Sequence, residues 1–205
     1  MKDMKKKIFV LAVMTVLVSS IAAGTLAYFT DSTMGHNVIT TGDVEIQLKE
    51  TTDRTDQNGN PIDFEDVSGV MPGTEVSKIV QVENIGLSDA YVRVKVDTEI
   101  ELLAGNTEKP DLGLVSVRYT TDNGDTMEYN TACWKKTDGY YYYLDKLEPG
   151  EITEPLITDV AFDTTMGNSY QGCTATVDVS AQATQAANNG SSALEAKGWP
   201  NGSRN

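Results

Sequence analysis

Apolar and polar residues alternate along short stretches of this chain, a pattern that predicts β-strands rather than helices. Over residues 43–49, Val44, Ile46 and Leu48 share one face, and charged or polar residues occupy the other. The alternation is clearest over 91–96, where valines take every second position. Further strand signals cover residues 76–82, 112–120, 133–143, 152–162 and 173–183.

Turn-forming residues separate these stretches. Asn58-Gly59, Asn123-Gly124, Asp138-Gly139 and Pro149-Gly150 are each typical of a tight turn between antiparallel strands. Roughly eight to ten short strands with almost no helical periodicity predict an all-β fold, an antiparallel β-sandwich. Periodicity alone does not choose between a jelly-roll and an immunoglobulin-like topology.

The first 27 residues are typical of a secretory signal peptide. Lysines precede an apolar stretch over 8–23 that is short for a membrane-spanning helix. Thr25 and Ala27 are suitably small for cleavage before Tyr28. We therefore expect an exported, extracellular protein, at the cell surface or in a surrounding matrix; an uncleaved N-terminal anchor is the alternative.

This interpretation divides the chain into four parts. They are a signal peptide over 1–27, an N-terminal segment over 28–40, a β-sandwich domain over 41–185 and a polar tail over 186–205. Removal of the signal peptide takes away four lysines and one aspartate, which changes the formal net charge from -14 to -17. So acidic a chain is unsuited to binding nucleic acid or anionic membranes, which require patches of Lys and Arg.

Cys133 and Cys173 are the two cysteines of the chain. An even pair in an exported protein is compatible with one disulfide, and two inert, buried thiols are the alternative. We favour the disulfide.

The residues offer little for catalysis. His36 is the one histidine in the sequence, so a His-Glu-x-x-His zinc motif is absent and a nucleophile–histidine pair would have to use this residue. Neighbouring carboxylates such as Glu99 and Glu101 are expected by chance in so acidic a chain and are typical of solvated surface. The sequence therefore favours a protein that is not an enzyme and needs no cofactor.

One acidic stretch is a weak candidate for Ca²⁺. Asp56, Asn58, Asn60 and Asp63 offer hard oxygen ligands, but Pro61 stands where an EF-hand loop needs glycine. An ordinary acidic turn is the favoured interpretation.

The tyrosine run at 140–143 is a candidate contact surface for carbohydrate or protein. In an extended strand alternate tyrosines face opposite ways. We favour the interpretation that two of them fill the core and two cover neighbouring strands.

Several segments resemble the TasA/camelysin family of exported bacterial proteins. The most specific is the signal-peptide junction, Gly24-Thr-Leu-Ala-Tyr-Phe-Thr-Asp, followed by Asn37-Val-Ile-Thr-Thr-Gly-Asp-Val-Glu-Ile. The other matching segments are Pro72-Gly73 to Val82, Asn84-Ile-Gly86, Ala90-Tyr-Val-Arg-Val, Leu147-Glu-Pro-Gly-Glu151 and Ala181-Gln-Ala-Thr-Gln-Ala-Ala. The resemblance spans nearly the whole chain.

The resemblance implies a jelly-roll-like sandwich and a structural role in fibres of a biofilm matrix. In such fibres the freed N-terminal segment inserts as a strand into the next subunit, which here assigns Tyr28, Phe29, Val38 and Ile39 to strand exchange. The implied partners are further copies of the chain in a head-to-tail homopolymer, a dedicated signal peptidase during export, and other matrix proteins.

Two other functions remain open. Camelysins have been described as metalloproteases, and a secreted hydrolase of that kind is one alternative. The other is a monomeric surface accessory or adhesin domain whose N-terminal strand completes its own sheet.

Overall fold

The computed structural model describes residues 44–65, 71–103, 107–170 and 172–200. The chain divides into two units, residues 1–35 and 36–205, and every described residue belongs to the second. The predicted signal peptide with its cleavage residues Thr25, Ala27 and Tyr28, and the strand-exchange residues Phe29, Val38 and Ile39, lie outside the described residues. No helix in the described ranges is long and apolar enough to cross a membrane.

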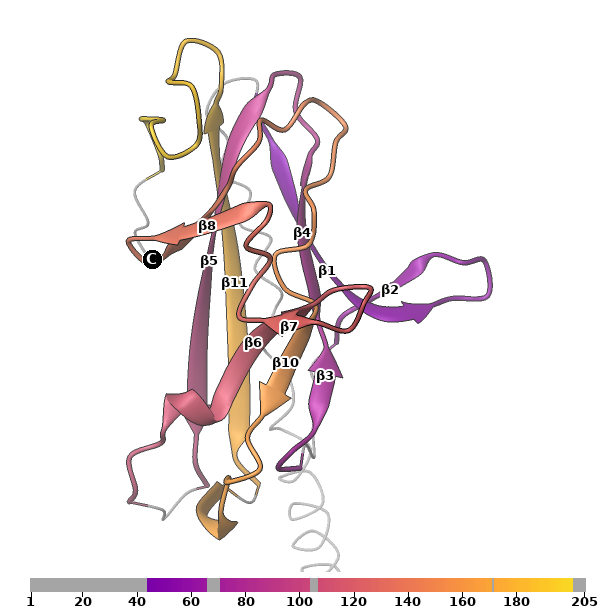
Figure 1. Cartoon of the computed structure of the whole chain (residues 1–205), viewed down its shortest axis with the longest axis vertical. Coiled ribbons are helices and arrows are strands. Elements are labelled where there is room, and N and C mark those ends of the chain that lie inside the picture. The colour runs from indigo at the N-terminus through magenta and orange to yellow at the C-terminus, as the bar shows by residue number, and fades with distance from the viewer. Residues whose placement is uncertain (1–43, 66–70, 104–106, 171, 201–205) are drawn as a thin grey trace, which may run out of the picture. The chain divides into compact units, whose positions relative to one another are not determined.

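The described part is built almost entirely of strands, with two short 3₁₀ helices (Figure 1). In chain order the elements are β1 (Ile46–Thr55), β2 (Pro61–Asp63), β3 (Glu75–Ser77), β4 (Ile79–Asn84), β5 (Ala90–Glu101), η1 (Leu112–Leu114), β6 (Val115–Thr120), β7 (Thr126–Met127), β8 (Trp134–Thr137), β9 (Tyr140–Tyr143), β10 (Asp159–Phe162), η2 (Asn168–Tyr170) and β11 (Thr174–Gln185).

The strands form three antiparallel sheets, in the orders β2-β1-β4, β3-β10-β6-β7 and β11-β5-β9-β8. The first two are continuous, because the segment before β10 bonds to the free side of β4: Val80 N donates to Ile157 O at 3.1 Å, and Leu156 N donates to Val80 O at 2.8 Å. They make one layer of a sandwich, and the third sheet makes the other.

The main core lies between these layers. Val44, Ile46, Val80 and Val82 come from the first layer, and the second contributes the valines of β5, the alanines of β11 and the aromatic residues of β8 and β9. A smaller cluster around Ile100, Val115 and Val160 fills the far end. The all-β antiparallel sandwich predicted from the alternating pattern is confirmed.

The local predictions hold where the turn chemistry is strong. Gly59, Gly124, Gly139 and Gly150 all have positive φ at their predicted turns. The stretch predicted as one strand over 112–120 begins instead with η1, because the Asp111 side chain accepts a hydrogen bond from Gly113 N and curls the chain before β6.

The predicted polar tail needs correction over residues 186–200. Ala186, Ala193 and Ala196 are buried, and the segment packs on Tyr91 and Tyr142 at the outer face of the β11-β5-β9-β8 sheet. We call residues 186–200 the C-terminal cap. Its small apolar residues are spaced too irregularly to signal burial, which explains why composition suggested a polar tail.

Candidate functional site

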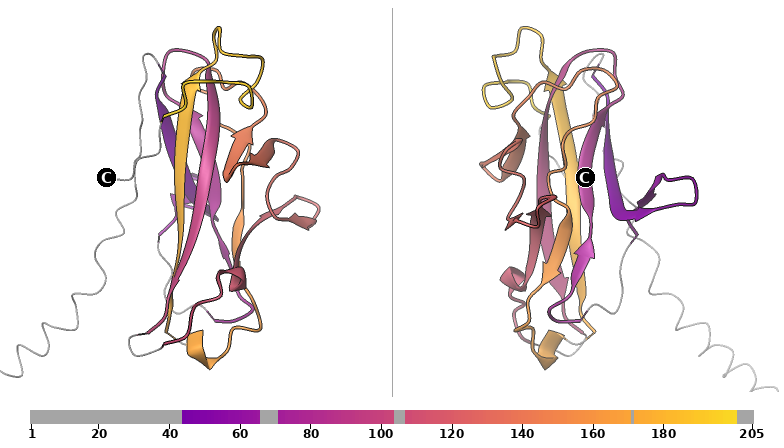
Figure 2. Two further views of the ribbon diagram at one scale, coloured as in Figure 1. Left: turned by 90° about the vertical axis from the view of Figure 1, so that its left-hand side faces the viewer. Right: turned by 45° about the vertical axis from the view of Figure 1, so that its right-hand side comes forward.

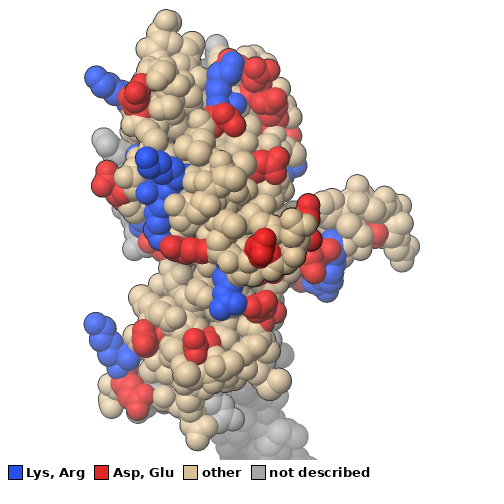
Figure 3. All heavy atoms as spheres, in the orientation of Figure 1, with Lys and Arg blue, Asp and Glu red and all other residues tan. Residues whose placement is uncertain are grey.

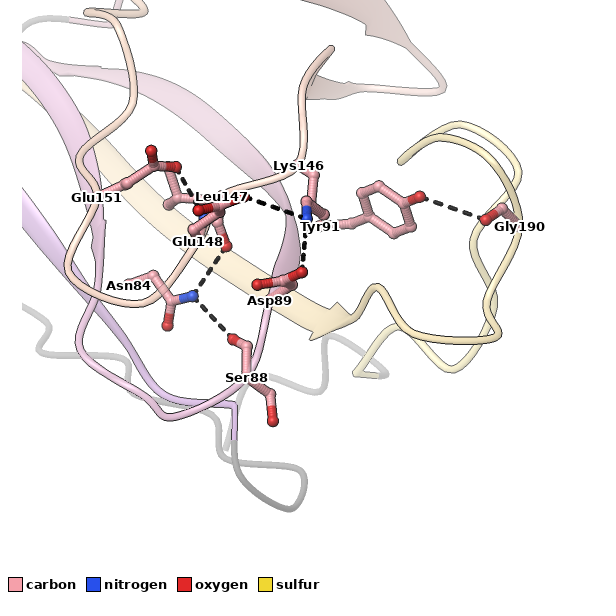
Figure 4. Close-up of polar contacts among 9 residues, drawn as sticks. All are labelled: Asn84, Ser88, Asp89, Tyr91, Lys146, Leu147, Glu148, Glu151 and Gly190. Carbon is pink, nitrogen blue, oxygen red and sulfur yellow. Dashed lines mark hydrogen bonds and ion pairs between the residues drawn. The ribbon is translucent and has the colours of Figure 1, made fainter.

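One end of the sandwich is organised by the buried amide of Asn84, the last residue of β4 (Figure 4). Its Nδ2 donates to the carbonyl oxygens of Ser88 and Leu147, both at 2.9 Å. Its Oδ1 accepts from Gly86 N at 3.0 Å. A single side chain therefore ties the β4–β5 turn to a loop distant in sequence. We call residues 84–90 and 144–152 the Asn84 end.

The loop at this end is held by its own turn. Glu151 N donates to Glu148 O at 3.0 Å across Pro149 and Gly150, as expected of a turn with Pro followed by a positive-φ Gly. The Glu151 carboxylate accepts from Glu148 N at 2.9 Å, and Gly150 N donates to Asn84 O at 2.8 Å. The loop is thus a rigid part of the sandwich.

The described chain begins at this same end. Ile85 N and Gly86 N donate to Glu45 O at 3.0 and 2.9 Å, and Ile46 lies opposite Asn84 in the β1–β4 ladder. Residues before Val44 therefore connect to the domain beside the β4–β5 turn. The segment assigned to strand exchange precedes this junction.

Beside the turn lies an open, mainly acidic hollow of about 420 Å³, lined by residues that include Asp145, Glu148, Glu151 and Lys146. Lys146 Nζ lies 2.6 Å from the Asp89 carboxylate and 3.4 Å from that of Glu148. These hydrogen bonds, that of Asp89 most strongly, raise the pKa of Lys146. The hollow is a polar surface feature rather than a closed binding cavity.

Groups with recognisable catalytic geometry are not evident in the described residues. Within those ranges no cluster of three or more His, Cys, Asp or Glu side chains is placed to hold a metal ion. His36 lies outside them. On the face drawn in Figure 3, acidic and basic side chains are interspersed rather than gathered into one basic patch.

The weak Ca²⁺ candidates lie on the hairpin between β1 and β2. Asp56 accepts hydrogen bonds from Asn58 N and Asn60 N, both at 2.8 Å, and from Asn60 Nδ2 at 3.1 Å. The Asn60 bonds, backbone first, lower the pKa of Asp56. Asp63 lies in β2 opposite Thr51. The Asp56 carboxylate is thus engaged in forming the turn.

Two strand edges lack a strand partner among the described residues. Among the described residues β11 pairs with β5 alone, so its other edge offers a row of backbone groups along all of Thr174–Gln185. β1 pairs with β4 on one side, and its first half has no strand partner on the other within the same described ranges. β1 approaches β11 across the sandwich, and Figure 2 shows β11 bordered by β5.

The tyrosine run divides as the favoured interpretation predicted. Tyr141 and Tyr143 belong to the main core, whereas Tyr140 and Tyr142 face the outer cluster beneath the C-terminal cap. Arg93 lies among them, with its Cζ 4.0 Å from the centre of the Tyr140 ring. No motif in the sequence marks this residue. The run is therefore mostly structural.

Both cysteines are free thiols. Cys133 packs against the main core and Cys173 against the cluster at the far end, so the favoured disulfide finds no support in this geometry. Burial raises the pKa of each thiol. The alternative of two unreactive thiols fits the arrangement better, although both are only partly buried.

Sequence motifs and geometry thus converge on one class, an all-β sandwich in which two of the segments named in the resemblance, Asn84–Gly86 and Leu147–Glu151, meet around Asn84. The role of Asn84 was missed, although the Asn84-Ile-Gly86 motif contained it. A family model described as camelysin metallo-endopeptidase matches residues 3–138, more than half of the chain. The chain belongs to this family, as the resemblance predicted. No curated protein matches the chain.

Proposed function

We propose that this protein is a secreted structural subunit that assembles into extracellular matrix fibres by N-terminal strand exchange. Cleavage after Ala27 frees Tyr28, and the released segment adds as a strand to a sheet edge of the next copy. Backbone hydrogen bonds supply the affinity, and Phe29, Val38 and Ile39 fill pockets along the edge. The contact is head-to-tail and does not close, so it propagates as a filament.

The observation that carries this proposal is the edge of β11 that has no strand partner among the described residues. It runs for 12 residues, twice the usual length of a strand, and an edge so long is a ready template for another chain. It also borders the side on which the first half of β1 has no strand partner among the described residues. An incoming strand there would extend one layer and close the gap toward the other.

The entry point of the N-terminal segment supports the same proposal. Glu45 anchors the start of the domain to the β4–β5 turn, so the preceding residues leave from the Asn84 end. Before cleavage, the signal peptide would tether this segment to the membrane and block exchange sterically. Export then controls when assembly begins.

The test uses processed protein, residues 28–205, and a synthetic peptide of residues 28–43. The peptide should compete for the acceptor edge and shorten the fibres seen by electron microscopy, whereas a scrambled peptide should not. A variant that lacks residues 28–33 should remain monomeric by light scattering. Fibres from that variant at the wild-type rate would exclude strand exchange by this segment.

The family's description supports a second candidate, a secreted metallo-endopeptidase. His36 is the one imidazole ligand or base available to it. Casein cleavage by the processed protein, measured with and without a chelator, tests this activity. Cleavage that is abolished by both the chelator and His36→Ala would establish the peptidase; a chelator-insensitive background that His36→Ala leaves unchanged would exclude it.

A further inference from the structure

Exposed apolar side chains are gathered at the two ends of the sandwich. Among the described residues the large exposed hydrophobic side chains number eight, and seven lie at one end or the other: Ile85, Leu87, Leu144 and Ile152 at the Asn84 end, and Met71, Leu103 and Leu112 at the opposite end. The eighth, Leu194, lies on the C-terminal cap. The long sides of the strands carry none within the same ranges. Such a distribution favours contacts through the ends.

The two groups lie at opposite ends because β5 joins them. Leu87 precedes the start of β5 at Ala90, and Leu103 follows its end at Glu101. A strand of 12 residues spans about 40 Å, so the groups are separated by the length of the sandwich. We call residues 71–74, 101–103 and 111–114 the Leu112 end.

At each end, hydrogen bonds hold the backbone beside one of the exposed leucines. Leu87 is 84% exposed, yet its turn is fixed by the hydrogen bonds of Asn84 to Gly86 and Ser88. At the Leu112 end, Asp111 N donates to the Tyr170 hydroxyl at 2.9 Å, which ties η1 to η2. Surfaces that are already ordered lose little conformational entropy on binding.

We propose that the Asn84 end of one copy docks on the Leu112 end of the next, with Leu87 and its neighbours against Leu103 and Leu112. The partner is a second copy because each copy carries both surfaces, and a repeated end-to-end contact covers both of them. This inference rests on the proposed function and adds to it a contact separate from strand exchange.

The place where the N-terminal segment joins the domain also favours a second copy as the partner. Glu45, at the start of the described domain, lies beside the β4–β5 turn, so a copy docked on the Asn84 end lies next to the point where this segment joins the domain. Fully extended, residues 28–43 span about 50 Å, enough to follow most of a neighbouring sandwich. The end contact positions the neighbour whose edge receives the strand.

The charge of the ends predicts the salt dependence. Asp145, Glu148 and Glu151 line the hollow with Lys146 at one end, and Glu101, Glu108 and Asp111 outnumber Lys109 at the other, so the docking ends repel at low salt. Screening by added NaCl reduces this repulsion over about 10 Å at 0.1 M. Fibre growth should therefore accelerate as salt rises, before any change in the folded state.

The experiment uses processed subunits, residues 28–205, in which a leucine at one end or the other is replaced by a charged residue. Leu87→Asp and Leu112→Asp should each raise the critical concentration for fibres about tenfold or more, the factor expected when one leucine is kept out of an apolar contact. Leu194→Asp, a matched change on the C-terminal cap, should leave it unchanged. Circular dichroism and the thermal midpoint confirm that each variant is folded.

A mixture of the two variants tests the pairing directly. Leu87→Asp retains an intact Leu112 end, and Leu112→Asp retains an intact Asn84 end, so the equimolar mixture should form dimers that cannot grow. At a concentration below the critical concentration of either variant, sedimentation should show dimers in the mixture and monomers in each variant alone. Wild-type fibres together with variants that assemble at the wild-type rate, or a mixture that stays monomeric, would overturn the end contact and leave strand exchange standing. Absence of wild-type fibres would overturn both.

Discussion

The two faces of the β11-β5-β9-β8 sheet are built from alternate residues of the same strands, yet they pack in different ways. On the inner face Val92, Val94 and Trp134 join a dry core that both layers share. On the outer face Tyr140, Tyr142 and Trp199 surround a charged side chain, beside the buried alanines of the C-terminal cap. One strand thus supports an apolar core on one side and a cation–aromatic stack on the other.

Arg93 is the centre of the outer face. Its Cζ lies 4.0 Å from the centre of the Tyr140 ring and 4.7 Å from that of Trp199. Its Nε donates to Gln182 Oε1 at 2.8 Å, and its Nη1 donates to the Tyr142 hydroxyl at 3.1 Å. Planar stacking with directed hydrogen bonds suits a guanidinium and allows it to lie beneath the C-terminal cap. The stability of the inner face depends on how apolar side chains fit together. The stability of the outer face depends on the guanidinium group of Arg93 and its particular partners.

The largest effect is expected on the inner face. Trp134 is 1% exposed, and its Nε1 donates to Glu154 O at 3.0 Å. Trp134→Ala should lower the free energy of unfolding by about 3–5 kcal/mol, because it leaves a cavity and an unpaired carbonyl. Chemical denaturation measures the change. A loss below about 1 kcal/mol would show that the two layers repack around this position.

A smaller effect is expected from the anchor of the C-terminal cap. Trp199→Ala removes a ring that packs edge-on against Tyr142 at 5.7 Å and covers Arg93. We expect a loss of about 1–2 kcal/mol, from one aromatic pair and one cation–π contact. Hydrogen exchange should show faster opening of residues 186–200 with β4 unaffected. Equal acceleration in β4 would mean that the two faces unfold as one unit.

Arg93→Lys tests whether the outer face requires the guanidinium group itself or only a positive charge. The positive charge remains, but the planar stack and the pair of directed hydrogen bonds are lost, so the free energy of unfolding should fall by about 1 kcal/mol. Lys95→Arg is the matched control two residues along β5, where Lys95 pairs with Asp97 in partly exposed surroundings. It should change stability by less than about 0.5 kcal/mol. Equal effects of the two changes would remove the special role of Arg93.

The smallest effect concerns acid. Hydrogen bonds from the Ser191 hydroxyl, at 2.7 Å, and then from its backbone N–H lower the pKa of Glu195 below its ordinary value of 4.5. A depressed folded-state pKa contributes stability above the unfolded value, and this contribution is lost as pH falls through the folded value. The C-terminal cap should therefore loosen slightly as the pH falls below 4.5, detected as a shift in the Trp199 indole NMR signal. Glu195→Gln should abolish that shift; its persistence would assign the transition to another carboxylate.

Much of the fold was predictable because β-strands and turns follow from patterns of neighbouring residues. The alternation around Val44 and Ile46 placed both side chains in the core, and the split of Tyr140–Tyr143 followed from the period of two. The turn at Pro149-Gly150 followed from the backbone preferences of its residues. Each of these predictions depends only on neighbours within a few positions.

The candidate site was less predictable because its contacts are long-range. The sequence marks Asn84 only as part of a motif, because its role depends on Leu147, which is 63 positions away. The C-terminal cap was expected to be a tail, since nothing in its composition reveals that Tyr91 and Tyr142 lie beneath it.

The sequence by itself determined the strand pattern, the turns and the resemblance to a family, because these depend on local backbone preferences and side-chain alternation. Only the tertiary structure decided that Asn84 and Leu147 meet at one end of the sandwich and that aromatic rings surround Arg93. It also decided that the β11 edge has no strand partner among the described residues. The physical reason is that strand order and edge exposure depend on which distant segments pair. Many pairings satisfy the same local pattern, and packing of the whole domain selects one of them.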